Sequence, residues 1–93
     1  MKQTTDFRYN TGASGAQSYT FQIRDSETIR LTVIRVASTY SVRLFAYIGQ
    51  SVSFTMLNGT SDPVSDITVN GDKITVTISS WATYANVIIE RFY

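Results

Sequence analysis

The chain has 93 residues, of which eight are basic and seven acidic, and it contains neither cysteine nor histidine. This length fits one domain, and the missing residue types exclude disulfide bonds, cysteine- or histidine-based nucleophilic catalysis and the two strongest zinc ligands. The balanced charge argues against nucleic acid as a partner, because nucleic-acid-binding domains usually carry a clustered basic excess.

The N-terminal segment, residues 1–16, combines a weak strand pattern at 5–9 with a connector rich in Gly, Ser and Ala. Such a connector is typically flexible, and it would let residues 1–9 reach a neighbouring subunit. The first residues include one lysine and no apolar stretch, which is not the pattern of a secretion signal. No run approaches the roughly 20 apolar residues of a membrane helix, so we expect no membrane insertion.

Alternation of apolar and polar residues, the pattern of half-buried strands, dominates the rest of the chain. Strands are predicted at 17–24, 28–37, 40–48, 51–57, 65–70, 73–79 and 85–92. Short turn signals separate them, and Asn70-Gly71 is the strongest, because a type I′ hairpin turn favours this dipeptide. Residues 1–93 are therefore expected to form a single all-β domain, an antiparallel β-sandwich or flattened barrel of seven to eight strands.

Two of these strands depart from simple alternation. Within 28–37 the phase slips after Val33, which predicts a bulge or a strand with two apolar faces. The strand at 40–48 is apolar on both faces. One face carries Val42, Leu44, Ala46 and Ile48, and the opposite face carries Phe45 and Tyr47. Such a strand either passes between two sheets or under a loop, or it presents Phe45 and Tyr47 to another subunit.

The last predicted strand is followed directly by the end of the sequence, "ANVIIERFY". Val87, Ile88 and Ile89 are consecutive apolar residues, and Phe92 and Tyr93 come after them. A run of this kind is typical of a strand that is covered on both faces. It predicts a central strand or a segment buried at an interface.

Carboxylates are the remaining candidates for catalysis. A glycan-acting enzyme would need two of them across a cleft, for example Asp66 or Asp72 together with Glu90. The simpler interpretation is that the aspartates cap turns in water. Asp62, Asp66 and Asp72 also lack the spacing of a calcium loop. We therefore expect no catalytic residues, no metal and no cofactor.

Aromatic residues make up 13% of the chain, and they are the better candidates for binding. Trp81, Tyr84 and Tyr40 are candidates for a platform that stacks on a sugar ring. The alternative for Trp81 is a plug that closes the end of the sheet. Phe45 and Tyr47 are the candidates for contact with a protein partner.

The segment "ITVNGDKITVTISSW", followed closely by "NVIIERF", resembles the C-terminal part of small β-rich proteins that phages and prophages encode. The resemblance covers about a quarter of the chain. Such proteins are commonly associated with tails or fibres, and they commonly assemble as trimers. The resemblance implies a location in the virion, or in the host cytoplasm before assembly.

We therefore predict a non-enzymatic binding or assembly module, associated with the virion as a structural or receptor-contacting protein. A carbohydrate-binding β-sandwich is the alternative, and a small glycan-acting enzyme is the third hypothesis. Because the chain is short and lacks disulfides and metal ligands, we also expect a homo-oligomer, with a trimer ranked before a dimer. Other virion proteins or a surface glycan are the further partners expected.

Overall fold

Eight strands follow one another along the chain in the computed structural model, which describes residues 3–10, 17–36, 39–78 and 85–93. They are β1 (Gln3–Asn10), β2 (Gln17–Gln22), β3 (Thr28–Val36), β4 (Thr39–Ile48), β5 (Ser51–Thr60), β6 (Val64–Asn70), β7 (Lys73–Ile78) and β8 (Ala85–Phe92). Each strand overlaps one of the predicted ranges. The strand predicted at 51–57 is longer in the structure, because β5 continues through Asn58 and Gly59 to Thr60.

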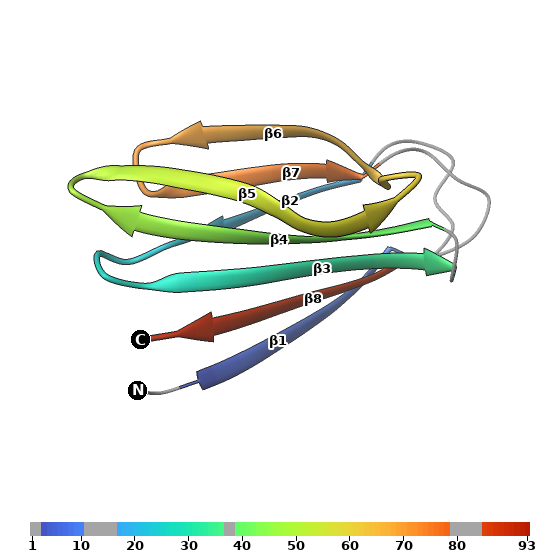
Figure 1. Ribbon diagram of the computed structural model, residues 1–93, viewed down its shortest axis with the longest axis horizontal. Coiled ribbons are helices and arrows are strands. Elements are labelled where there is room, and N and C mark those ends of the chain that lie inside the picture. Colours follow the sequence, from blue (N-terminus) through green and yellow to red (C-terminus); the bar gives the residue numbers. More distant parts are fainter. Residues whose placement is uncertain (1–2, 11–16, 37–38, 79–84) are drawn as a thin grey trace.

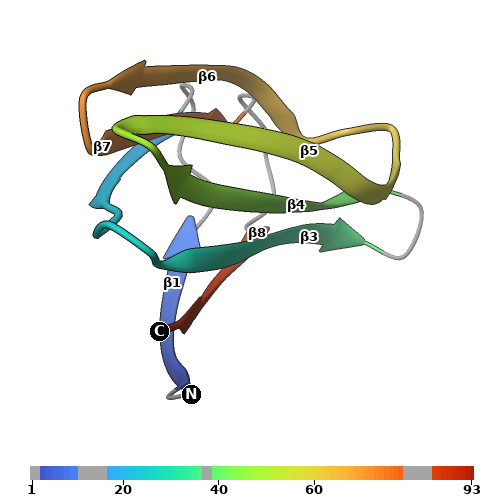
Figure 2. The same cartoon turned by 60° about the vertical axis from the view of Figure 1, so that its left-hand side comes forward.

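The strands form two antiparallel sheets, which confirms the predicted all-β sandwich. The larger sheet has the order β1-β8-β3-β4-β5, and the smaller has the order β2-β7-β6. Figures 1 and 2 show that β5 ends the larger sheet beside β6, which ends the smaller one. The N-terminal strand β1 pairs with β8 of the same chain over its whole length.

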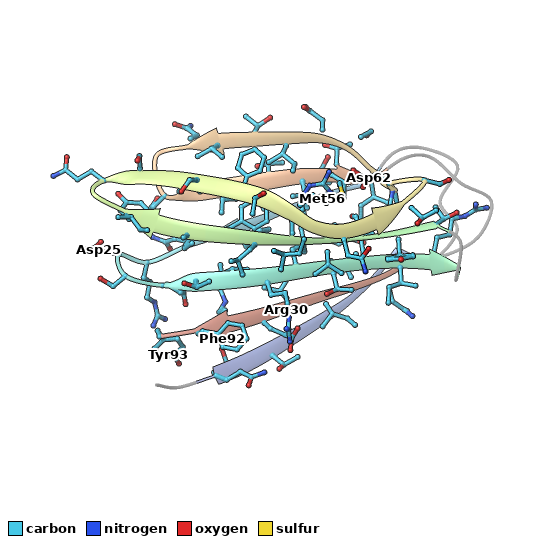
Figure 3. All side chains as sticks on the ribbon, in the orientation of Figure 1. Asp25, Arg30, Met56, Asp62, Phe92 and Tyr93 are labelled. Atoms are coloured by element: carbon cyan, nitrogen blue, oxygen red, sulfur yellow. The ribbon has the colours of Figure 1, made fainter. Side chains whose placement is uncertain are left out.

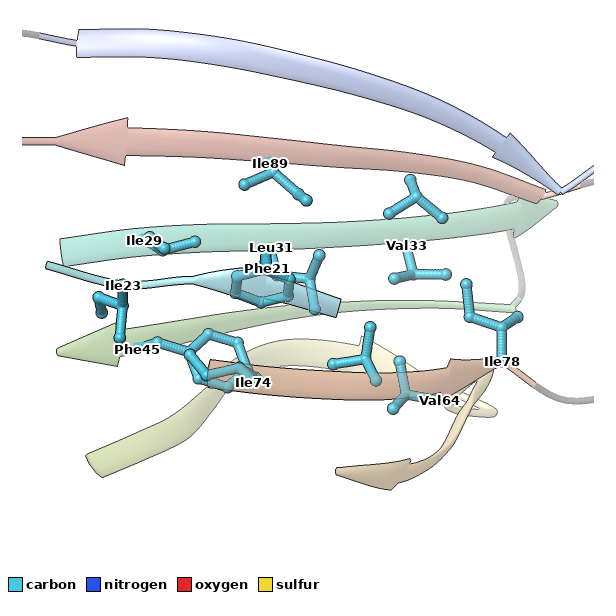
Figure 4. Packing of buried hydrophobic residues seen from close by; sticks show 12 residues of the cluster. Phe21, Ile23, Ile29, Leu31, Val33, Phe45, Val64, Ile74, Ile78 and Ile89 are labelled. Atoms are coloured by element: carbon cyan, nitrogen blue, oxygen red, sulfur yellow. The ribbon is translucent and has the colours of Figure 1, made fainter. Parts of the chain in front are cut away.

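The core lies between the two sheets and is built from the inward residues of alternating strands (Figure 4). Its buried members are Phe21, Ile23, Ile29, Leu31, Val33, Phe45, Val64, Ile74, Val76, Ile78, Val87 and Ile89. Most of them recur at every second position, because successive side chains of a strand point to opposite faces. The central strand of the smaller sheet, β7, contributes three fully buried side chains to this core.

The face of β4 that carries Phe45 and Tyr47, which the sequence left either covered or presented to another subunit, is the inner face of the larger sheet. Phe45 is fully buried in the core, where its backbone lies opposite Ile29 of β3 and Phe54 of β5. Leu44 and Ala46 point to the outer side of the larger sheet instead. The physical reason is the space between the sheets, which the large ring of Phe45 fills and which Ala46 would leave partly empty.

Strand β8 is a central strand, as its apolar run predicted. It pairs with β1 on one side and β3 on the other, and Val87 and Ile89 are buried in the core. Ile88 points to the outer side and is half-buried. The predicted irregularity in β3 is also present, as a shift of its register against β4 between Ile34 and Val36.

The two hairpin turns show how local sequence sets the connections. In the β6–β7 hairpin, Asn70 pairs with Lys73, so the central residues are Gly71 and Asp72 and not the predicted Asn70-Gly71. Only Gly71 has a positive φ, of 64°, which fits a type II′ turn with glycine first. In the β4–β5 hairpin, Gly49 and Gln50 both have positive φ, which is the type I′ pattern.

A buried ion pair ties the two sheets together near the C-terminus. Glu27, in the β2–β3 connection, is 1% exposed, and its Oε1 accepts hydrogen bonds from the Arg24 amide and from Arg91 Nη1. Arg91 of β8 also donates to the Gln22 carbonyl, with a distance of 2.7 Å. One guanidinium therefore links the end of β2 to the larger sheet.

Candidate interaction edge at strand β5

Strand β5 forms an edge of the larger sheet and is exposed along nearly all of its length. Of its ten residues only Val52 is half-buried. Phe54, Met56 and Leu57 are 45%, 44% and 54% exposed, and Ile48 at the end of β4 is 70% exposed. We define these four side chains as the edge cluster. Met56 of this cluster is labelled in Figure 3. An exposed strand edge that carries apolar side chains is a typical docking surface.

The edge cluster contains most of the large exposed hydrophobic side chains in the described part of the chain. The other two are Val69 on β6 and the terminal Tyr93. Those two lie on separate elements, whereas the edge cluster is confined to one hairpin. The apolar exposure is therefore concentrated at the β5 edge.

Phe54 is held in place by a row of aromatic rings that reaches into the core. Its ring centroid lies 5.4 Å from that of Phe45 in a tilted arrangement. Phe45 in turn makes an edge-to-face contact with Phe21, with centroids 5.8 Å apart. Because two buried rings support it, Phe54 needs little ordering before it contacts a partner.

Two hollows flank this edge. A groove of about 300 Å³ runs between β5 and β6, and its lining residues are Arg43, Phe54, Val64, Ser65, Asp66 and Ile67. A second hollow, of about 220 Å³, lies beside Leu44, Ala46, Ser53, Phe54 and Thr55. Phe54 contributes to both, so it is the central residue of the surface.

An ion pair between β4 and the loop before β6 borders the groove. The Arg43 guanidinium bonds both carboxylate oxygens of Asp62, and it also donates to Ser41 Oγ at 3.1 Å. Partial burial disfavours the charged form of Asp62. The hydrogen bonds that Asp62 accepts from Arg43, the Val64 amide and Ser41, together with the positive charge of Arg43, outweigh this effect of burial. The pKa of Asp62 therefore lies below its usual value.

The predicted aromatic candidates that the structure describes do not gather at one place. Tyr40 is half-buried at the start of β4, opposite Ile34 and Thr60. Tyr47 is also half-buried, but it packs against the core on the inner face. Phe45, fully buried, reaches the surface only through Phe54.

Trp81 and Tyr84, the other predicted binding residues, lie outside the residues that the structure describes. Their role as a sugar platform remains a prediction from the sequence. The described surface places its aromatic contact at Phe54 instead.

The three carboxylates considered for a glycan-acting enzyme lie on different parts of the sandwich. Asp66 belongs to β6 and lines the groove, and Asp72 lies in the β6–β7 turn, where Gln22 Nε2 donates to it at 2.6 Å. Glu90 is on β8 in the larger sheet, where Arg30 bonds both of its oxygens at 2.8 and 2.9 Å.

Glu90 is committed to a structural ion pair. The hydrogen bond from Arg30 lowers the pKa of Glu90, and partial desolvation only partly opposes it. The Arg30 guanidinium also lies 5.7 Å from the ring centroid of Phe92 (Figure 3). Because its neighbours Ile89 and Leu31 point inward, Glu90 faces the outer side of the larger sheet.

The sequence did not identify Phe54 and Met56 as surface residues. Their alternation with Ser53 and Thr55 is that of any half-buried strand. The available signal was the absence of charged residues from Ser51 to Thr60, which is unusual for a strand edge. That signal becomes informative only when β5 is known to be an edge.

The described residues contain no group of three or more acidic side chains that could hold a metal ion. The same part of the chain includes no helix long and apolar enough to cross a membrane.

No protein-family model matches the sequence, and no curated protein matches it. Among solved structures, the chain is similar to tailspike protein gp49 from Acinetobacter baumannii bacteriophage Fri1, which is described as a capsular polysaccharide depolymerase. The TM-score is 0.61 at 10% sequence identity, and the match covers 97% of this chain and 17% of the tailspike. At this identity the similarity establishes a shared fold, and the chain spans a small fraction of the tailspike's length.

Proposed function

We propose that this chain is a non-enzymatic binding and assembly module of a phage tail, spike or fibre. The single observation that carries the proposal is the β5 edge, an uncharged strand whose apolar side chains are exposed beside an open groove. The fold shared with part of a tailspike supports the association with a virion. Self-association then follows as the simplest way to cover the edge.

The arrangement of polar groups supports a role without catalysis. The sequence has no histidine or cysteine, and its carboxylates at Asp62 and Glu90 are held by arginines. Asp66 lines the groove on β6, whereas Glu90 is bonded by Arg30 on the larger sheet, and this separation supports a role without catalysis.

The test is the molar mass in solution, measured by light scattering at micromolar concentration. We expect a multiple of the 10.4 kDa of one chain. Met56→Lys places a charge in the edge cluster and should reduce the mass to that of a monomer. Val69→Lys is the matched control, because Val69 is also an exposed hydrophobic residue on an edge strand but lies on β6. A wild-type mass of one chain that does not change on concentration contradicts self-assembly.

A carbohydrate-binding role is the second candidate, and the groove is the observation that favours it. Phe54 offers a partly exposed ring next to Arg43 and Asp66, and sugar sites combine an aromatic face with polar groups of this kind. The tailspike with the shared fold is described as acting on a polysaccharide.

A glycan array with two variants distinguishes the possible sugar sites. A hit that Phe54→Ala abolishes and Trp81→Ala retains assigns binding to the groove. The reverse result assigns it to the aromatic platform predicted from the sequence around Trp81 and Tyr84. An array without reproducible hits contradicts the carbohydrate candidate.

A further inference from the structure

The free side of β5 is a regular and uncharged strand edge. Its other side pairs with β4, and none of the described strands pairs with the free side. Two of the other three edge strands include charged residues in their sequences: β6 includes Asp66, and β1 includes Asp6 and Arg8. The shorter edge strand β2 is uncharged like β5. Charged residues are the usual protection against edge-to-edge pairing, and β5 has none from Ser51 to Thr60. Two β5 strands that pair therefore bring no charged side chains of their own against each other.

The segment Val52–Met56, "VSFTM", is complementary to itself when it is reversed. With Phe54 opposite Phe54 of a second copy, Val52 lies opposite Met56, and Ser53 lies opposite Thr55. Val52, Phe54 and Met56 share the inner face, since they pair with Tyr47, Phe45 and Arg43 on the inner face of β4. The apolar residues would therefore face each other on one side and the hydroxyl residues on the other. Both kinds of cross-strand pair stabilise antiparallel sheets.

The shape of β5 limits the pairing to this segment. Its register against β4 is regular from Ser51 to Met56 and shifts where Val42 and Arg43 face Asn58 and Met56. Leu57 is the additional residue at that bulge. Because a bulge twists an edge strand, a regular partner strand fits best along the residues before it.

We propose that two copies of this chain pair through β5, antiparallel, around a twofold axis at Phe54, so that their larger sheets join into one. The inference rests on the proposed function, since it names a second copy as the occupant of the same edge. The twofold contact is closed, so neither copy keeps a free β5 edge. From the sequence we expected a trimer before a dimer, whereas the self-complementarity of "VSFTM" favours the twofold pair.

The buried support of Phe54 makes this contact specific. Phe45, which itself contacts Phe21, supports the Phe54 ring, so the two Phe54 side chains meet without a large loss of conformational freedom. The groove between β5 and β6 would be covered at the same time, because Phe54 forms part of its lining.

Single cysteine substitutions test the register, because the chain has no cysteine of its own. Ser53→Cys and Thr55→Cys are made as separate proteins that differ in a tag, mixed, and oxidised gently after a check of the fold by circular dichroism. Residues directly opposite in an antiparallel pair have Cα atoms about 4.5–5.5 Å apart, which a disulfide spans. We expect the mixture to form the mixed dimer, and neither variant alone to crosslink efficiently. Like residues are diagonal at about 7–8 Å, at or beyond the limit of disulfide geometry.

The outcomes separate this inference from the proposed function. An oligomer in light scattering without the mixed disulfide overturns the β5 pairing and leaves self-assembly intact. Efficient crosslinking of Ser53→Cys with Thr68→Cys, on β6, shows that β5 pairs with β6 of another copy and also overturns it. A monomer at all concentrations contradicts both proposals.

Discussion

Phe45 is the residue that connects the core to the candidate surface. It contacts Phe21 on the smaller sheet and Phe54 at the exposed edge, with centroid distances of 5.8 and 5.4 Å. The sequence could not assign it to the inner face, because β4 is apolar on both faces and alternation alone does not distinguish them. The pairing with Ile29 decides the orientation, and that pairing is a property of the sheet and not of the strand.

Asp62 provides a test by pH at the same scale. Its pKa is depressed in the folded chain, so the stabilisation from its ionised form is complete above the pKa of the unfolded chain, near ~3.9. It is lost as pH falls through the lower pKa of the folded state. We expect Asp62→Asn to reduce the free energy of unfolding by about 1–2 kcal/mol at about pH 7. The difference from wild type should shrink below about pH 4.

Urea denaturation at several pH values measures this difference. Asp66→Asn is the control, because Asp66 is an exposed carboxylate on the neighbouring strand. Glu90 titrates with a lowered pKa in both proteins, so its contribution cancels in the comparison. A difference that stays constant down to about pH 2 would show that the Asp62 carboxylate does not stabilise the fold through its charge.

At the scale of the elements, the sequence was sufficient to predict the strands. It also predicted where the turns lie, but not which turn type each one adopts. Period-2 alternation locates a strand whatever its neighbours are, which is why each predicted strand overlaps an observed one. The β6–β7 turn shows the limit. Asn70-Gly71 favours type I′ locally, but the core fixes Val69 opposite Ile74 and moves the turn to Gly71-Asp72.

The two hairpins predict opposite responses to substitution. Gln50 has φ of 69°, which is unfavourable for a side chain with a Cβ, so Gln50→Gly should stabilise the protein by up to about 1 kcal/mol. Gly71 has φ of 64°, and no heavy atom lies within 4 Å of the position that an added Cβ would take. Gly71→Ala therefore costs only backbone strain, about 1 kcal/mol. Thermal denaturation of both variants measures these effects, and a stabilising Gly71→Ala would contradict the turn assignment.

At the scale of the whole molecule, strand order was the property that the sequence did not predict. The strands from 51–57 and 73–79 show the same alternation, but β7 is central and β5 is an edge. Phe54 and Met56 are exposed on that edge strand, and no described strand pairs with its free side. The candidate site was therefore missed although its strand was correctly located.

The core of so small a domain makes Phe45 critical for folding. Phe45→Ala should lower the free energy of unfolding by about 3–5 kcal/mol, because it leaves a cavity between the sheets. That is a large part of the roughly 5–14 kcal/mol expected for 93 residues. Phe54→Ala is the matched comparison and should cost markedly less, since Phe54 is 45% exposed. Equal losses for both variants in urea denaturation would contradict the position of Phe45 in the core.

Pairing through β5 also predicts that stability depends on protein concentration. When the folded state associates and the unfolded state does not, mass action stabilises the folded chain as concentration rises. A roughly hundredfold increase should therefore raise the melting temperature of the wild type by several degrees. Phe54→Lys places two like charges opposite each other at the twofold axis, so its melting temperature should not change with concentration. Val69→Lys, at the edge of the other sheet, should keep the wild-type dependence, and a loss of that dependence in Val69→Lys but not in Phe54→Lys would move the contact from β5 to β6.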